Sequence, residues 1–330
     1  MAETTFRDAL NQALREEMRR DPNVFIVGEE VGEYGGAYKV TQGILDEFGP
    51  ERVIDTPISE EAIAGTGIGA AMIGLRPVVE MMTINFALLA MDQIVNHAAK
   101  LHYMSGGQVT IAMVVRAAEA AGLQLGAQHS QNLEPWFAHV PGLKVVAPGT
   151  PADAKGLLKS AIRDNNPVIF IEHEAIYGSK GDVPEEEYTI PIGVAEVKRP
   201  GADVSLITYS RMLLTCTKAA EQLAAEGIDA EIVDVRTLRP LDSETIVNSV
   251  KKTHKAIVVE EDWRSVGMGA EIAARIQEEA FDYLDAPVMR LALAETPMPY
   301  SKPLEQSAIP SVDDIVRAAR RITSSNPLPP

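Results

Sequence analysis

Residues 143–171 have the sequence LKVVAPGTPADAKGLLKSAIRDNNPVIFI, and this stretch decides the fold class. Its two ends, 143–147 and 167–171, are short apolar runs of the length that buried strands have. The middle part, 151–163, is predicted to be a helix. A helix between two strands of one sheet serves as the crossover that parallel strands require. The stretch therefore predicts an α/β fold, in which a parallel sheet is covered by helices on both faces.

The same alternation continues through the chain in both directions. At the N-terminus, Thr5 can cap a helix in which Phe6, Leu10, Leu14 and Met18 recur every four residues. Further strands are predicted at 24–27, 77–81, 109–115, 203–208, 229–235, 255–260 and 288–293. Further helices are predicted at 59–75, 86–104, 130–139, 212–226, 242–252, 267–281 and 311–322. The whole chain is therefore expected to form two α/β domains of three layers, each built on a parallel sheet.

Residues 177–200 interrupt this alternation. They combine several glycines and prolines with the run Glu185-Glu186-Glu187, and they show little helical or strand periodicity. That composition is typical of a connecting segment. A chain of 330 residues is long enough to bury two separate cores. We therefore expect a first domain at 1–185, a linker at 186–200 and a second domain at 201–330.

The charge and the cysteine content exclude several classes of function. The formal net charge is −17, and an acidic protein of this kind repels the phosphates of nucleic acid. The single cysteine, Cys216, allows neither an intrachain disulfide nor a metal site built from several cysteines. No apolar run reaches the roughly 18 residues that a membrane span requires. The sequence thus predicts a protein of a reducing compartment that binds neither nucleic acid nor membrane.

A glycine-rich run at 65–70 offers one alternative function. The sequence GTGIGA fits the fingerprint of dinucleotide-binding folds, which would indicate a nicotinamide dehydrogenase. That fingerprint requires a strand immediately before it, whereas residues 59–64 resemble the capped start of a helix. The glycines are therefore expected inside a helix, where close packing against another backbone would compensate for their cost. The chain also lacks a Gly-Asp-Gly motif of the kind that binds magnesium diphosphate.

Two polar segments are candidates for chemistry. His129 lies in a polar loop, 128–131, between a predicted strand and a predicted helix, where α/β sheets place their active sites. Glu60 follows Ser59, which can cap the helix at 59–75, and an acidic residue is favourable at that end of a helix. From the residues alone, a single loop histidine is more often incidental, and capping is a sufficient explanation for Glu60.

Several stretches together resemble a known family. They are GEEVGEYGGAYKVTQG (28–43), RVIDTPISE (52–60), GLRPVVEMMTINF (74–86), AQHSQ (127–131), DAKGLLKSAIRDNNPV (153–168), VRTLRPLD (235–242), VVEEDW (258–263) and PMPY (297–300). In this order they resemble the E1 β subunits of pyruvate dehydrogenase complexes, from about residue 4 to about residue 322. The resemblance implies a pyrimidine-binding domain followed by a transketolase C-terminal-type domain.

The family implies a cofactor and partners. It binds thiamine diphosphate, of which the β chain holds the aminopyrimidine, while a separate α subunit holds the diphosphate and Mg²⁺. The missing Gly-Asp-Gly motif agrees with that division. The implied assembly is an α2β2 heterotetramer on a lipoyl acyltransferase E2 core. Its reaction is the oxidative decarboxylation of pyruvate with reductive acetylation of the lipoyl group, which yields acetyl-CoA in the complete complex.

The resemblance also assigns roles to individual positions. Glu60 matches the glutamate that shares a proton with N1′ of the aminopyrimidine, and His129 matches the histidine that assists acyl transfer to the lipoyl group. Apolar positions that line the aminopyrimidine match Ile58, Met82 and Phe86, although Met82 fits an ordinary core residue equally well. A structural potassium site of some relatives, formed mostly by backbone carbonyls, matches Met113, Ala161, Ile162, Asp164 and Asn166.

The sequence leaves some alternatives open. Branched-chain 2-oxo acid and acetoin dehydrogenases have E1 β subunits of the same fold, and a non-catalytic E1 β-like scaffold is a rival of another class. Relatives follow the arginine that matches Arg116 with a glycine-rich loop, whereas residues 117–121 here read AAEAA and favour helix. The expected location is the cytoplasm of a bacterium, or an organelle matrix if the chain is a processed mature form.

Overall fold

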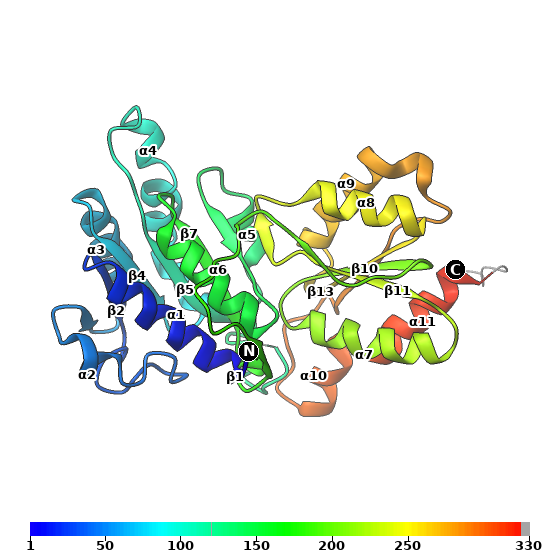
Figure 1. Cartoon of the computed structure of the whole chain (residues 1–330), viewed down its shortest axis with the longest axis horizontal. Helices are drawn as coiled ribbons and strands as arrows, with labels where there is room; N and C mark the ends of the chain where they lie inside the picture. The colour runs from blue at the N-terminus through cyan, green and yellow to red at the C-terminus, as the bar shows by residue number, and fades with distance from the viewer. Residues whose placement is uncertain (120, 325–330) are drawn as a thin grey trace. The chain divides into compact units, whose positions relative to one another are not determined.

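Residues 1–119 and 121–324 are described by a computed structural model, in which the chain forms two units (Figure 1). The first unit consists of Met1–Ala120 and Trp136–Ile192, and the second consists of Ala121–Pro135 and Gly193–Pro330. The segment 121–135 thus belongs to the second unit, although the sequence places it in the first domain. The predicted domain limits at 185 and 201 stay predictions, and residues 325–330 of the second domain lie outside the described residues.

The first unit contains a parallel sheet. Its neighbouring strands follow the order β6-β7-β5-β4-β2-β3, and every pairing among them is parallel. The strands are β2 (Val24–Gly28), β3 (Val53–Asp55), β4 (Arg76–Met81), β5 (Val114–Glu119), β6 (Lys144–Val146) and β7 (Val168–His173). The helices are α1 (Phe6–Arg20), α2 (Ile44–Phe48), α3 (Glu60–Met72), α4 (Leu101–Met104) and α6 (Pro151–Arg163). Two shorter strands, β1 (Ala2–Thr5) and β8 (Lys180–Val183), pair with each other in antiparallel register.

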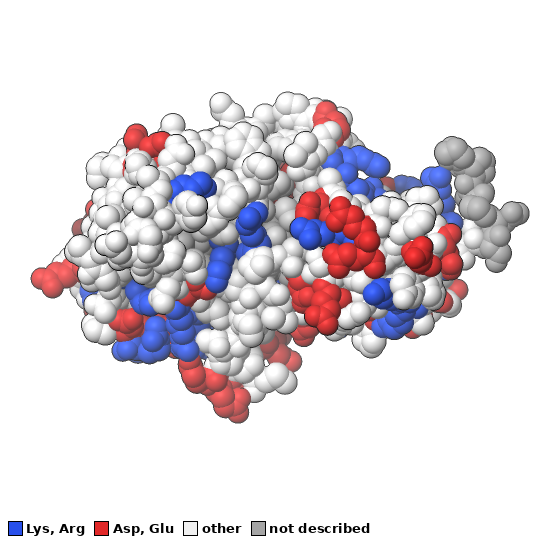
Figure 2. Space-filling model, turned by 90° about the horizontal axis from the view of Figure 1, so that it is seen from above, with Lys and Arg blue, Asp and Glu red and all other residues white. Residues whose placement is uncertain are grey.

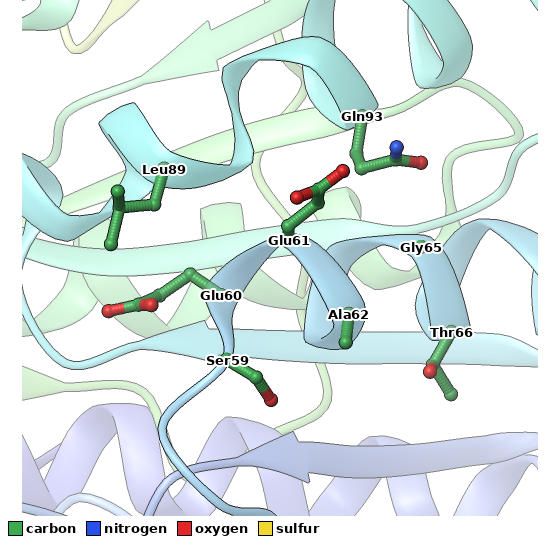
Figure 3. Close-up of a pocket in the computed structure, with 8 residues that line it drawn as sticks. All are labelled: Ser59, Glu60, Glu61, Ala62, Gly65, Thr66, Leu89 and Gln93. Atoms are coloured by element: carbon green, nitrogen blue, oxygen red, sulfur yellow. The ribbon is translucent and has the colours of Figure 1, made fainter.

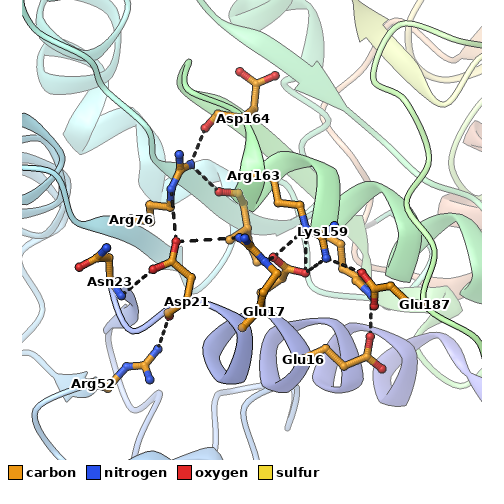
Figure 4. Close-up of polar contacts among 12 residues, drawn as sticks. Glu16, Glu17, Asp21, Asn23, Arg52, Arg76, Lys159, Arg163, Asp164 and Glu187 are labelled. Atoms are coloured by element: carbon orange, nitrogen blue, oxygen red, sulfur yellow. Dashed lines mark hydrogen bonds and ion pairs between the residues drawn. The ribbon is translucent and has the colours of Figure 1, made fainter.

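Helices α1 and α6 begin as the sequence predicts and pack side by side. The hydroxyl of Thr5 accepts a hydrogen bond from the backbone N of Asp8, and Thr150 accepts one from Asp153 in the same way. Oppositely charged side chains then join the two helices, as Figure 4 shows. The ion pairs include Glu17 with Arg163, 2.6 Å apart, and Glu16 with Lys159, 2.7 Å apart.

The second unit has three layers. Its sheet has the strand order β14-β13-β10-β11-β9, in which only β9 is antiparallel to its neighbour. Helices α8 and α9 cover one face of this sheet, and α7 and α11 cover the other (Figure 1). The strands are β9 (Glu196–Arg199), β10 (Val204–Thr208), β11 (Ala230–Asp234), β12 (Thr237–Arg239), β13 (Ala256–Trp263) and β14 (Met289–Leu293). The helices are α7 (Met212–Ala225), α8 (Ser243–Thr253), α9 (Met268–Ala280), α10 (Lys302–Ala308) and α11 (Val312–Thr323), and α5 (Glu134–Ala138) spans the change of unit.

The α/β fold class is confirmed, but two local predictions are wrong. The predicted helix at 86–104 is divided into a 3-10 helix, η1 (Ile84–Ala90), a π-helix, η2 (Asp92–Ala98), and α4. The buried residues of η1 are three apart, which matches the three residues per turn of a 3-10 helix. The strand predicted at 109–115 begins at Val114 instead. The linker at 186–200 stays a prediction, and β9 lies in its last part.

The alanine-rich run after Arg116 does not form a helix. Residues 117–119 belong to β5, where Ala117 pairs with Ile171 and Ala118 with Glu172. Pairing with β7 at all three residues, and with β4 at Ala117, gains hydrogen bonds that override the helical preference of alanine. Ala120 lies outside the described residues. In the part of the chain that the structure describes, no helix combines the length and the apolar character needed to cross a membrane.

Candidate functional site

Glu60 is the first residue of α3, and its placement follows from the turn before it. Ser59 occupies the capping position, but its hydroxyl donates to the carbonyl of Pro57 at 3.1 Å and makes no side-chain capping bond to the helix. The prediction that Ser59 caps α3 through its side chain is therefore wrong. The helix still begins there, because the backbone N of Ile63 donates to the carbonyl of Ser59 at 2.9 Å.

The α3 helix is held close to the sheet by a glycine. A Cβ atom on Gly67 would lie 2.5 Å from Cγ2 of Val79 and 3.3 Å from Cε of Met113. These neighbours are side chains, so the prediction of close packing against another backbone is wrong. At Gly69 a Cβ would meet nothing within 4 Å. Only the middle glycine of the run is needed for packing, and it seats α3 on β4.

An open pocket of about 790 Å³ lies beside the start of α3 (Figure 3). Its lining comes from the first two turns of α3 and from η1 and η2, and consists of Ser59, Glu60, Glu61, Ala62, Gly65, Thr66, Leu89 and Gln93. Glu60 is only 4% exposed, whereas Leu89, on the opposite wall, is 64% exposed. Among the described residues none donates a hydrogen bond to the Glu60 carboxylate. The pocket thus presents a buried acceptor beside exposed apolar surface, which suits a partly apolar ligand that carries an N–H donor.

A second carboxylate, Glu29, lies near Glu60. Burial raises the pKa of Glu29, and the negative charges of Glu60 and then Glu30 raise it further. One of its oxygens is buried and has no hydrogen-bond partner among the described residues. The sequence analysis missed Glu29, although it directly follows β2, at the carboxyl end of a central strand. That position in a parallel sheet is a signal for a functional residue.

The three apolar positions assigned to the aminopyrimidine do not line this pocket. Ile58 lies in the turn before α3 and is 80% exposed, so in this chain it has little apolar contact. Met82 directly follows β4, Phe86 belongs to η1, and both are half-buried. The partial exposure of Met82 does not match the alternative that it is an ordinary core residue. These residues leave apolar surface near the carboxyl ends of β3 and β4.

His129 belongs to the second unit and Glu60 to the first. The segment that carries His129 is anchored by buried carboxylates of its own unit. One oxygen of Glu305 accepts hydrogen bonds from the backbone N of Gly122 at 3.0 Å and of Gln124 at 2.8 Å. Glu261 accepts one from the backbone N of Ala121 at 3.2 Å. His129 itself is half-buried, and its segment is fixed at the end that follows β5.

Two of the five positions assigned to potassium accept hydrogen bonds from an arginine side chain. The guanidinium of Arg76 donates to the backbone carbonyls of Ile162 at 3.0 Å and of Asp164 at 3.1 Å (Figure 4). The carbonyl of Met113 accepts a hydrogen bond from the backbone N of Val168 at 3.0 Å, and the side chain of Asn166 donates to Asp164 at 2.8 Å. No group of three or more His, Cys, Asp or Glu side chains among the described residues could hold a metal ion. The potassium assignment, including Ala161, stays a prediction.

A buried ionic cluster stiffens the central strands of the first unit. The Arg116 guanidinium on β5 donates to Glu80 on β4 and to Glu172 on β7, and Tyr177 donates to Glu172 at 2.7 Å. Burial raises the pKa of Glu80, an effect that the charge of Arg116 opposes. Nearby, burial raises the pKa of Glu174 to about 7, although the hydroxyl of Tyr38 donates to it at 2.5 Å. The two ion pairs of Arg116 join β5 to its neighbours β4 and β7 in one sheet.

Comparisons with known proteins match two successive parts of the chain to two families. The family described as "Transketolase, pyrimidine binding domain" matches residues 2–180, and the family described as "Transketolase, C-terminal domain" matches residues 193–315. Among solved structures, the chain resembles a split-gene transketolase described as an inactive β4 tetramer, with a TM-score of 0.80 and 22% identity, covering 96% of this chain and 97% of that one. A transketolase from Leishmania mexicana gives a TM-score of 0.73 at 15% identity, covering all of this chain and 47% of that one. These two likenesses concern the fold alone.

Relatives found by sequence have higher identity to this chain than these two solved structures. The mitochondrial pyruvate dehydrogenase E1 component subunit β of Dictyostelium discoideum is 53% identical over 328 residues, which cover 98% of this chain and 92% of the relative. The corresponding subunit of Rickettsia conorii is 52% identical over 318 residues, covering 96% and 98%. That of Rhizobium meliloti is 52% identical over 323 residues, covering 98% of this chain and 70% of the relative.

Proposed function

The chain belongs to the family of pyruvate dehydrogenase E1 β subunits, and from that membership we propose how its residues serve the reaction. It is the β subunit of a thiamine-diphosphate-dependent E1 that acts with an α subunit and an E2 component. Relatives at 51–53% identity carry the name pyruvate dehydrogenase, which favours pyruvate over a branched-chain acid or acetoin as the substrate.

The Glu60 carboxylate carries the proposal for the cofactor site. It is a buried acceptor at the start of α3, it has no donor among the described residues, and it faces a pocket with an apolar wall. A protonated ring nitrogen of an aminopyrimidine would supply the missing donor. The ring's apolar faces would lie near the surface left open by Leu89, Met82, Phe86 and Ile58. We assign the aminopyrimidine of thiamine diphosphate to this place.

Thiamine diphosphate, when bound, supplies the carbon nucleophile and the electron sink for decarboxylation. The part of this chain is to hold the ring and to control one proton. Glu60 accepts the N–H of N1′ and can take or return that proton, because a carboxylate in this position is both the acceptor and the nearest base. The pKa of Glu29 is raised by burial and also by the charge of Glu60. The two carboxylates therefore disfavour being negatively charged at the same time.

His129 is proposed to assist transfer of the acyl group to the lipoyl group of E2. Glu305 and Glu261 hold the backbone at the beginning of the segment that carries His129. The diphosphate and Mg²⁺ are assigned to the α subunit, in an α2β2 heterotetramer. We place the enzyme in a bacterial cytoplasm or in an organelle matrix, as the bacterial and mitochondrial relatives suggest.

The function is tested by assaying pyruvate decarboxylation with thiamine diphosphate and Mg²⁺. The chain by itself should be inactive, because half of the cofactor site belongs to the α subunit, and the co-expressed pair should be active. A pair that assembles stably, binds the cofactor and decarboxylates no 2-oxo acid would instead support the scaffold alternative. A pair that prefers branched-chain acids to pyruvate would overturn the substrate. Omission of K⁺ should lower the stability of the pair if the potassium assignment holds.

The nicotinamide alternative is not supported by the local structure. Its fingerprint requires the glycines to follow a strand, whereas all three lie within α3, and α3 is preceded by the turn at Ser59. A nicotinamide dehydrogenase would bind NADH as the isolated chain, which fluorescence titration can measure. We expect no binding.

A further inference from the structure

A second pocket lies within the second unit, and it is lined by none of the residues to which a part in the reaction is assigned. It has a volume of about 700 Å³ and is formed by the edge strand β14, the residues that follow it, and the helices α10 and α11. Ligand pockets of soluble proteins have volumes of roughly 300–1,000 Å³. All residues that line this pocket belong to one unit, so its shape is fixed by a single fold.

The charged side chains in this lining are mainly arginines. They are Arg264, Arg290, Arg317 and Arg321, against the two carboxylates Glu295 and Asp314. The protein as a whole has a net charge of −17, so a positive lining is contrary to its overall charge. Figure 2 shows acidic and basic side chains in several clusters on the face in view, some of them adjoining, so that the negative charge is not evenly spread.

Two of the four guanidinium groups make no ion-pair contact with a carboxylate among the described residues, although the charge of Arg264 acts on Glu260 and opposes the rise that burial causes in the pKa of that carboxyl. Arg290 is paired with Glu260 at 3.0 Å, and Arg317 is paired with Asp314. Arg264, in contrast, donates only to the backbone carbonyl of Arg290, at 3.3 Å. Arg321 has no side-chain partner in the described part of the chain, and Nε of Arg290 is buried without an acceptor. The pocket therefore holds more donors and more positive charge than its own residues satisfy.

The rest of the lining is apolar. Met289, Leu291, Leu293 and Ile309 contribute to it, together with Ala308 and Pro310. A guanidinium group binds phosphate oxygens with two parallel hydrogen bonds, and several of them enclose one phosphate well. An apolar floor beside such groups suits a ligand in which the phosphate is attached to an organic body.

We propose that the pocket between β14 and α11 binds a small organic phosphate, through the guanidinium groups of Arg264, Arg290, Arg317 and Arg321. The anionic end lies among the arginines, and the organic end lies on the apolar residues of β14 and α10. This binding is independent of the proposed catalytic function, because none of these residues has a part in it.

The test is isothermal titration calorimetry of the full-length chain with phenyl phosphate and with inorganic phosphate, at low ionic strength. We expect saturable one-to-one binding of phenyl phosphate that weakens as NaCl is added, since salt screens the attraction. Inorganic phosphate should bind at least threefold more weakly, because it cannot contact the apolar residues. Equal affinity for the two probes would overturn the organic part of the proposal.

Variants of α11 identify the site. The double variant Arg317→Gln/Arg321→Gln should raise the Kd for phenyl phosphate at least tenfold, and both side chains are exposed, so folding should be preserved. Arg320→Gln is the control: it removes one of the positive charges of the same helix, but Arg320 pairs with Glu226 and does not line the pocket. Its Kd should stay within twofold of wild type. Equal losses in both variants, or no saturable heat with the wild type, would contradict the proposal.

Discussion

The backbone N of Gln124 donates a hydrogen bond of 2.8 Å to the carboxylate of Glu305, a residue 181 positions further along the chain. The same oxygen accepts from Gly122, whose φ is +91°, and Gln124 itself has a φ of +59°. Both residues lie in the left-handed region, where the chain turns sharply after β5. Glu305 therefore fixes the turn that follows β5 and leads to His129.

Removal of this carboxylate should release the turn. In Glu305→Ala the N–H groups of Gly122 and Gln124 lose a charged acceptor, a loss of about 1–3 kcal/mol of local stability. Hydrogen exchange of a peptide covering 121–126 should become at least tenfold faster. Glu305→Gln keeps an acceptor oxygen and should be intermediate, and Gln306→Ala, an exposed neighbour, should match the wild type. Unchanged exchange in Glu305→Ala would show that the turn does not depend on this carboxylate.

The glycines of α3 make opposite predictions at two positions. Gly67→Ala places a Cβ 2.5 Å from Val79 and should lower the free energy of unfolding by about 1–3 kcal/mol. Gly69→Ala meets nothing within 4 Å and should raise it by about 0.5–1 kcal/mol, because alanine favours helix. Urea unfolding of both variants measures the difference. Two variants of equal stability would contradict the packing of α3 on β4.

The buried guanidinium of Arg116 should be essential for stability. Arg116→Met leaves the carboxylates of Glu80 and Glu172 without their shared partner, which should cost about 3–5 kcal/mol. The surface pair of Arg275 with Glu271 provides the control, since Arg275→Met should cost at most about 1 kcal/mol. Thermal unfolding that ranks the two variants equally would show that the cluster is not stabilising.

The carboxyl of Glu174 should make stability depend on pH. Its pKa is raised to about 7 in the folded chain, by burial, from an ordinary value of 4.5. Between these two values the folded state binds a proton that the unfolded state does not, so the free energy of unfolding falls as pH rises. The fall amounts to at most about 3 kcal/mol.

Comparison with a neutral variant isolates that effect. Glu174→Gln has no proton to lose, so the wild type should lose stability relative to this variant as pH rises from about 5 to about 7. Thermal melts of both proteins across that range measure the difference. A difference that stays constant, or that grows in favour of the wild type, would contradict the raised pKa.

Helices were predictable from sequence where the spacing of apolar residues and the position of a capping residue indicate the same boundary. The helix at 151–163 is found with the bounds that its apolar spacing predicts, and Thr5 caps α1. The last helix begins at Ser311 with reciprocal hydrogen bonds to Asp314. In these segments the local preference and the tertiary structure favour the same conformation, so periodicity alone is sufficient.

The predictions from sequence failed where contacts between residues far apart in the chain determine the local conformation. Alanine favours helix, yet residues 117–119 are the end of a strand, because β7 pairs with all three residues and β4 also pairs with Ala117. Ser59 has the residue type of a cap, but a carbonyl two residues away takes its hydroxyl. Glu60 could be assigned only by family resemblance, since its spacing is that of any capped helix. Glu29 was missed because its proximity to Glu60 depends on how β2 and α3 pack.

The most direct test of the central claim, that Glu60 controls the proton of the aminopyrimidine, is C2–H exchange of thiamine diphosphate in the assembled enzyme. Glu60→Gln is compared with the wild type, and Glu51→Gln, an exposed glutamate of the preceding loop, is the control. We predict that exchange slows by at least a factor of 100 in Glu60→Gln, while the cofactor still binds and the subunits still assemble, and that Glu51→Gln exchanges at the wild-type rate. Wild-type exchange in Glu60→Gln would contradict the assignment of Glu60.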